Sequence, residues 1–301
     1  VFTAISFISM TIHLYLTRDY LPTKGFKLNL KFCYQALLDS IFIFLISILF
    51  TLDSRIDILI LSFISNDFYI GLYTAAFSII SFFYIFPQAF RDVIFPYLSR
   101  YHSSNKEMTK KIYYFSVKYI LLLTIPMAAG VCILSSEIIN IIFAQEFTNA
   151  STLLKIGIWI FPLYSIMLFN SRLLVVDYKS KFVSICLFFS SALIASLNLI
   201  FYPKYGIVIS SIIRVMAVIL LTSAIVFKVS KELYRVNLKG NLIKILSSTF
   251  IMSIAVNSLK NLSVVFAIFV GIVVYFLINF ILKTFSIEDL NYWKLVFKSK
   301  K

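Results

Sequence analysis

Long apolar runs, interrupted by short polar connections, are the dominant pattern along this chain. A helix that crosses the ~30 Å hydrocarbon core of a membrane needs about 20 mostly apolar residues, and runs near this length recur from end to end. The pattern therefore predicts nine membrane-spanning helices. They cover residues 1–16, 37–64, 68–90, 119–134, 156–176, 182–202, 207–227, 242–259 and 262–282.

Composition supports a membrane protein and excludes an ordinary soluble domain. Hydrophobic residues make up 60% of the chain, aromatic residues 17% and charged residues 14%, with a mean hydropathy of +0.94. A closed β-barrel would show short segments of alternating polarity, which are lacking here. The predicted fold class is an all-α integral membrane protein, a polytopic helical bundle.

Lys and Arg predict how the helices are oriented. Most of the 28 basic residues fall in alternate connections, and positively charged connections stay in the cytoplasm. This places the basic segment 283–301 in the cytoplasm and explains the net charge of +15 as a topology signal. Nucleic-acid binding would need these charges on one folded surface, so we expect no nucleic-acid partner.

The chain offers few groups for catalysis. Cys33, Cys132 and Cys186 lie far apart, and His13 and His102 are the only histidines. We therefore expect no metal, no cofactor and no catalytic residues, which means that the protein is not an enzyme. The predicted outer connections are also too short to hold the carboxylate pair of a sugar-processing site. Movement of a substrate is favoured over reaction with one.

Three charges interrupt the apolar run 37–64, in the stretch "TLDSRIDILILSF". Asp53 and Asp57 are four residues apart and share one helix face, while Arg55 points away from both. Charges inside a membrane are costly and usually face a partner or a polar cavity. The run would be about 42 Å long as a helix, so a tilted helix could instead lift these charges to the outer headgroups. Both placements stay open.

Further polar or helix-bending residues lie in other runs. Arg91 stands at the end of 68–90 and Arg214 lies within 207–227, and each could anchor a helix at the interface or face a cavity. Pro87 and Pro126 are the hinge candidates, because proline frees a backbone carbonyl and permits a bend. Bent helices suit a transporter that encloses its substrate.

Several motifs resemble bacterial polysaccharide flippases, in matching order. They are "RIDILILSFISNDFYIGLYTAAFSI" (55–79), "IFPQAFRDVIFPYLSR" (85–100), "LSSEIINIIFAQEFTNASTLLKI" (134–156) and "LNLIFYPKYGI" (197–207). The chain is thus identified as a member of the multidrug/oligosaccharidyl-lipid/polysaccharide (MOP) exporter superfamily, in its O-antigen or capsule flippase branch. The resemblance implies a fold similar to multidrug exporters, with two six-helix bundles around a central cavity.

The resemblance also implies a domain order. Residues 1–16 would be the last helix of a first bundle that is otherwise missing, and 17–36 a cytoplasmic linker. Residues 37–229 would form the second six-helix bundle, followed by two additional helices in 242–282 and the basic cytoplasmic tail 283–301. Because the chain opens on Val1, we interpret it as incomplete at its N-terminus.

The implied function is translocation of undecaprenyl-pyrophosphate-linked oligosaccharide across the bacterial cytoplasmic (inner) membrane by alternating access. A polysaccharide polymerase and a chain-length regulator are implied partners. Bidentate Arg suits pyrophosphate, so Arg55 is the first binding candidate, Arg91 the second and Arg214 the third. Asp57, then Asp53, would pair with a cation or carry a coupling proton. A cation-coupled multidrug exporter and a membrane glycosyltransferase or polymerase remain the alternatives, as does a remnant without activity.

Overall fold

The structure is a computed structural model that describes residues 2–18, 29–285 and 289. All regular structure in these residues is helical, which confirms the all-α fold class. The helices are α1 (Phe2–Thr17), α2 (Leu30–Ile64), α3 (Asp67–Phe83), α4 (Ile85–Ser104), α5 (Lys106–Ile133), α6 (Ser135–Ile142), η2 (Gln145–Phe147), α7 (Ala150–Gly157), α8 (Ile160–Val176), α9 (Ser180–Tyr205), α10 (Ile207–Glu232), α11 (Lys239–Leu259) and α12 (Val264–Ile281).

The chain divides into two compact units, residues 1–41 and residues 42–301. In the first unit, α1 and the opening turns of α2 expose the side chains that are described. Asn29 caps α2, since its side chain accepts a hydrogen bond from the Phe32 amide at 3.1 Å. The predicted linker 17–36 is thus helical from Leu30 onward, as the first turns of α2. Residues 19–28 of that linker lie outside the described part.

Six segments of the described chain are long and apolar enough to cross a membrane. A seventh follows if α7 and α8, bent by 41° relative to each other, form one span. The remaining two predicted spans fall on α1 and α2, so the expectation of about nine is consistent with the fold. The protein is a multi-pass membrane protein.

Several helices extend beyond the predicted apolar runs, and polar side chains cap α2 and α5 before those runs begin. The run 119–134 is the clearest case: α5 begins at Lys106, where the Asn105 side chain accepts from the Met108 amide at 2.9 Å. A hydropathy pattern detects the membrane-buried part of a helix and misses such extensions.

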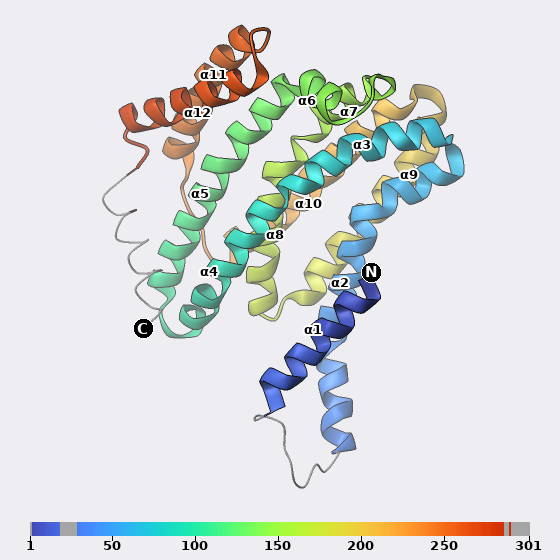
Figure 1. Cartoon of the computed structure of the whole chain (residues 1–301). Helices are drawn as coiled ribbons and strands as arrows, with labels where there is room; N and C mark the ends of the chain where they lie inside the picture. The colour runs from blue at the N-terminus through green and yellow to red at the C-terminus, as the bar shows by residue number, and fades with distance from the viewer. Residues whose placement is uncertain (1, 19–28, 286–288, 290–301) are drawn as a thin grey trace. The chain divides into compact units, whose positions relative to one another are not determined.

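The second unit is built around α10, which packs against both α8 and α9 (Figure 1). α5 lies between α4 and α8 on one side and α11 on the other. Three apolar clusters fill this unit. The first joins α4, α5, α8, α9 and α10, the second joins α3 and α7 to the C-terminal part of α5, and the third joins that part of α5 to α11 and α12.

α11 and α12 form a pair that attaches to α5 (Figure 1). A Cβ atom at Gly271 of α12 would lie 2.6 Å from Val256 Cγ2 of α11, so only glycine fits there without displacement. Tyr275 of α12 donates a hydrogen bond to the Leu122 carbonyl of α5 at 2.7 Å. These helices occupy the region predicted for the two additional spans, 242–282. Of the predicted tail, only residues 283–285 and 289 are described.

The two predicted hinges differ in their local structure. α3 ends at Phe83, four residues before Pro87, which is the position whose carbonyl a proline ring displaces. A turn at Tyr84 then leads into α4. Pro126, in contrast, lies inside an uninterrupted α5. Whether either residue acts as a hinge during transport stays a prediction.

Candidate functional site: a buried charge cluster between three helices

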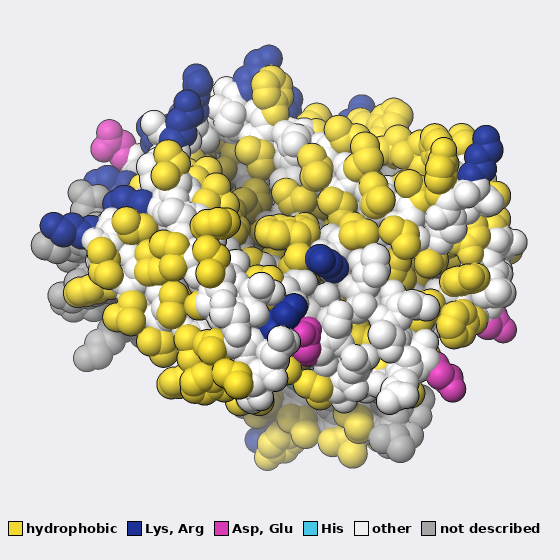
Figure 2. Space-filling view, turned by 90° about the horizontal axis from the view of Figure 1, so that it is seen from above, with side chains coloured by type: hydrophobic (Ala, Val, Ile, Leu, Met, Phe, Trp, Pro, Cys, Tyr) yellow, Lys and Arg dark blue, Asp and Glu magenta, His cyan; other side chains and the backbone are white. Residues whose placement is uncertain are grey.

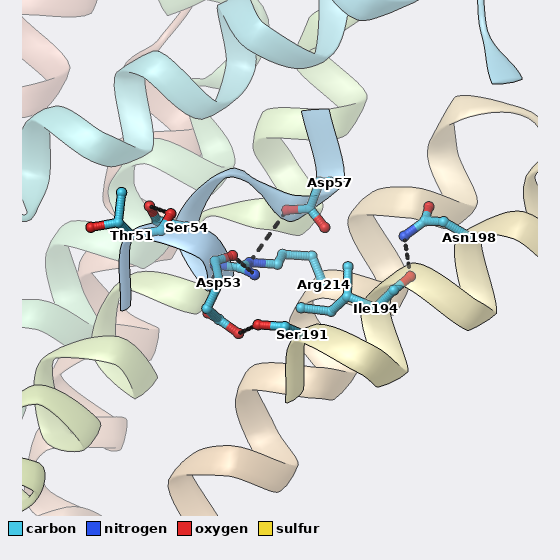
Figure 3. A network of polar contacts seen from close by, with 8 residues as sticks. All are labelled: Thr51, Asp53, Ser54, Asp57, Ser191, Ile194, Asn198 and Arg214. Carbon is cyan, nitrogen blue, oxygen red and sulfur yellow. Dashed lines mark hydrogen bonds and ion pairs between the residues drawn. The ribbon is translucent and has the colours of Figure 1, made fainter. Parts of the chain in front are cut away.

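Asp53 and Asp57 of α2 are buried, with 4% and 3% of their surface exposed. As the sequence predicts, the two side chains lie on one helix face, and both contact Arg214 of α10 (Figure 3). The Arg214 Nη2 atom lies 3.1 Å from Asp53 Oδ2, and its Nε atom lies 3.5 Å from Asp57 Oδ2. Arg214 is itself buried, so two carboxylates share one guanidinium inside the protein.

Asp53 is held more tightly than Asp57. Arg214 Nη1 also donates to the Asp53 backbone carbonyl at 2.6 Å, and Ser191 Oγ of α9 donates to Asp53 Oδ1 at 3.4 Å. The cluster therefore connects α2 to α9 and α10, two consecutive helices that are far from α2 in sequence (Figure 3). Removing one member of a buried ion pair is strongly destabilising, because the other charge is left without compensation.

The cluster carries an excess negative charge, since it has two carboxylates and one guanidinium. Asp57 Oδ1 is buried without a hydrogen-bond partner in the described part of the protein. The Tyr73 hydroxyl also lacks a partner at close hydrogen-bond distance, and it lies near enough to Asp57 to interact with its carboxylate as a donor. Asn198 Oδ1 and the hydroxyls of Ser210 and Ser211 are further unpartnered buried atoms on α9 and α10. Asp57 is thus the member with capacity to take up a proton or another cation.

Arg55, the first predicted binding residue, is exposed and does not take part in this cluster. Its position is that expected of a residue halfway between Asp53 and Asp57 on a helix, which points to the opposite face. Arg91 of α4 is paired with its neighbour Asp92, with Nε 2.7 Å from Oδ1. The three predicted arginines therefore do not converge on one point.

Aromatic side chains lie between the charge cluster and Arg91. Tyr84 and Tyr164 stack with their ring centroids 4.2 Å apart, and both are within electrostatic range of Arg214. Tyr164 is also within electrostatic range of Arg91 and of Arg172, a cation of α8 that interacts with Arg91. Polar aromatic groups thus bridge the two sets of charges.

Many large hydrophobic side chains of the described helices are exposed. Figure 2 shows hydrophobic side chains spread over one face, with Lys and Arg both at its edge and near its centre. Among the described residues, no three His, Cys, Asp or Glu side chains gather where they could hold a metal ion.

Sequence reasoning placed Arg214 last among the arginines, whereas the structure makes it the partner of both carboxylates. A signal was available: Asp53 and Asp57 share a face that Arg55 cannot reach, so a second helix had to supply the cation. The contribution of Ser191 carried no signal, because serine occurs in eight of the nine predicted runs. The buried pair of Lys118 and Asp289, with Nζ to Oδ2 at 2.8 Å, was also missed.

A family described as "Polysaccharide biosynthesis protein" matches residues 2–152. The probable low-salt glycan biosynthesis flippase Agl15 of Haloferax volcanii is 32% identical over 104 residues, which are 34% of this chain and 22% of that protein. Among solved structures, lipid II flippase MurJ in an inward closed conformation has a TM-score of 0.70 at 21% identity, over 90% of this chain and 59% of that one. The chain spans less than two thirds of either protein.

Together, the apolar helices and the fold define a multi-pass helical membrane protein, with a fold similar to that of MurJ. The family match extends over about half of the chain. The chain belongs to the family of polysaccharide biosynthesis proteins, which confirms the resemblance noted in its motifs.

Proposed function

We propose that this protein moves a lipid-linked oligosaccharide across the cytoplasmic membrane by alternating access. The buried cluster of Asp53, Asp57 and Arg214 carries the proposal. Charges inside a membrane protein usually mark a substrate or ion pathway, and here they join three helices of a polysaccharide biosynthesis protein. The likeness to flippases of glycan and lipid II supports the same class of cargo.

Undecaprenyl pyrophosphate is the proposed carrier, and an O-antigen or capsule repeat unit the proposed cargo. Arg55 and Arg91 remain the proposed pyrophosphate contacts. Arg55 is exposed, and Arg91 would exchange Asp92 for the phosphate. Arg214 is less suited to this role, because both carboxylates already occupy its guanidinium. A polymerase and a chain-length regulator are proposed partners, and the C-terminus is proposed to be cytoplasmic.

Coupling is assigned to Asp57. When Asp57 takes up a proton or metal cation, the excess negative charge of the cluster disappears and its hold on Arg214 weakens. Such a change alters the attraction between α2 and α10, which is the kind of differential contact that alternating access requires. Residues 37–229 would then move as the second bundle against its partner bundle.

The test is allele replacement in the native host, with surface polysaccharide as the readout. Arg55→Gln, Arg91→Gln and Asp57→Asn are each expected to reduce it at least about tenfold, the effect of losing one charge-assisted contact, while Lys181→Gln, an exposed control, leaves it unchanged. Lipid-linked repeat units should accumulate on the cytoplasmic side of the membrane. Wild-type amounts of surface polysaccharide from all three variants would contradict the proposal.

Two measurements on the same strains address the alternatives. A multidrug exporter predicts that deletion raises sensitivity to cationic drugs and leaves the polysaccharide intact. A glycosyltransferase or polymerase predicts shorter or unfinished chains that still reach the cell surface. A flippase predicts neither result.

A further inference from the structure

A cavity lies apart from the charge cluster, where α5, α8, α10 and the start of α11 meet. Its volume is about 890 Å³. Along α5 its lining runs from Lys110 to Leu121, which is about 16 Å of helix. This length matches the hydrocarbon depth of one membrane leaflet, half of a ~30 Å core.

The cavity changes character along that length. Lys110, Arg235 and Lys239 lie at one end of the lining, and the lining includes no Asp or Glu among the described residues. Val117, Leu121 and Val226 line the other end. Such a gradient from cationic to apolar complements an amphiphile with an anionic head and a hydrocarbon chain.

Two polar groups of the lining are already hydrogen-bonded to the protein. The Tyr113 hydroxyl donates to Asn170 Oδ1 at 2.8 Å, and the Thr222 hydroxyl donates to the Leu163 carbonyl at 3.3 Å. A water-soluble anion would gain little from this interior, because its polar groups would be desolvated without new partners. A hydrocarbon chain meets no such cost.

The cationic end belongs to two connections that the distribution of Lys and Arg predicts to be cytoplasmic, 91–118 and 228–241. Anionic phospholipids give the cytoplasmic leaflet its negative surface potential and attract basic segments next to the membrane. We propose that this cavity binds an anionic glycerophospholipid of the cytoplasmic leaflet, with its phosphate at Lys110, Arg235 and Lys239 and one acyl chain along α5 and α10.

Bound lipid would link α5 to the connection between α10 and α11. Asn241 of α11 already donates to the Tyr114 hydroxyl of α5 at 2.6 Å beside the cavity. The lipid is therefore a structural ligand of this corner, and the proposal holds whatever the protein transports.

Native mass spectrometry of the purified full-length protein tests this, with phosphatidylglycerol, phosphatidylcholine and undecaprenyl phosphate as probes. The cavity variant is Lys110→Ala/Arg235→Ala/Lys239→Ala. The control, Lys106→Ala/Lys111→Ala/Lys231→Ala, removes three exposed cations that do not line the cavity. A third variant, Val226→Trp, fills the deep end without changing charge.

Wild type and control should retain phosphatidylglycerol in preference to phosphatidylcholine. The cavity variant should bind phosphatidylglycerol more than about tenfold more weakly, since each basic residue contributes a factor of about five. Val226→Trp should also lose the bound lipid. Equal losses in cavity variant and control would mean general electrostatic attraction and overturn the proposal. So would tighter retention of undecaprenyl phosphate than of phosphatidylglycerol by the cavity.

Discussion

The role of a charged side chain in this protein depends on which face of its helix it occupies. Arg55 is two residues from each carboxylate in sequence, yet it is exposed and outside the cluster. Arg214 is 161 residues from Asp53 and donates to its backbone carbonyl. The ~100° step between neighbouring helix positions explains the first fact, and packing of α10 beside α2 explains the second.

Replacement of Arg214 by Met should lower the free energy of unfolding by about 3–5 kcal/mol, because two buried carboxylates lose their cation. Denaturation in mixed detergent micelles measures this. The triple variant Asp53→Asn/Asp57→Asn/Arg214→Met should recover much of the loss, since no uncompensated charge remains. Arg55→Gln is the matched control and should stay within about 0.5 kcal/mol of wild type. A stable Arg214→Met protein would contradict the proposed importance of the pair.

At this scale the sequence predicts the shared face of Asp53 and Asp57, because that follows from helix geometry alone. It does not predict which helix supplies the cation. That depends on the packing of α2, α9 and α10, and a single sequence contains no direct signal of packing between distant residues. The same applies to Ser191, whose contact with Asp53 depends on the position of α9.

At the scale of helices, the two predicted hinge prolines affect the backbone differently. Pro87 is preceded by the end of α3 and a turn, whereas Pro126 leaves α5 intact. The carbonyl that Pro126 leaves without an amide partner is that of Leu122, four residues earlier. This is the carbonyl that Tyr275 reaches from α12. Pro126 thus leaves a free carbonyl on α5 that accepts a hydrogen bond from α12.

Tyr275→Phe should reduce stability by about 1–2 kcal/mol, because it leaves the buried Leu122 carbonyl unsatisfied. In a Pro126→Ala background the effect should shrink, since the substituted alanine offers a backbone amide to that carbonyl. A double-mutant cycle on detergent-purified protein measures the coupling. Tyr205→Phe, at an exposed position of α9, is the control. Additive effects of the two changes would show that Pro126 and Tyr275 act independently.

The sequence predicts which segments are helical, but it does not predict where each helix begins and ends. Hydropathy locates the membrane-spanning part of α5, but the start of the helix at Lys106 depends on the Asn105 cap. The turn at Tyr84 was anticipated only as a bend near Pro87. Local side-chain hydrogen bonds decide such boundaries, and they are weak signals against a strongly apolar background.

Among the described residues of the second unit, the buried hydrogen-bonded side chains that lie farthest apart in sequence join α5 to the C-terminal segment. Lys118 donates to both carboxylate oxygens of Asp289, at 3.0 and 2.8 Å, and each side chain is 3% exposed. The sequence assigns Lys118 to a basic cytoplasmic connection and 283–301 to a basic tail. The single acid of that tail which is described is the residue that contacts α5.

Asp289→Asn should therefore lower the free energy of unfolding by about 3–5 kcal/mol, because Lys118 would be buried without a countercharge. The unfolding transition in detergent gives the value. Glu107→Gln removes an exposed carboxylate of the same helix α5 and should change little. If both variants have the same free energy of unfolding as wild type, the Lys118–Asp289 pair does not contribute to stability.

The general architecture was predictable because membranes impose simple rules. Long apolar runs have to become helices, and basic connections favour one side. Family motifs then pointed to the polysaccharide biosynthesis class. Buried ion pairs such as that of Lys118 were not predictable, because a Lys near the end of an apolar run is read by default as an interfacial anchor.

The pairing of α2 with α10 also has a consequence for how the protein is made. Asp53 and Asp57 enter the membrane with α2, but Arg214 is synthesised 161 residues after Asp53. At about 5–20 residues per second, the two carboxylates wait roughly 8–32 s for their cation. During this interval α2 carries charges that each cost about 2.5–3.5 kcal/mol in lipid. Release of α2 from the insertion machinery should therefore be delayed until α10 emerges, and ribosome-arrested chains ending before and after Arg214 would reveal the delay.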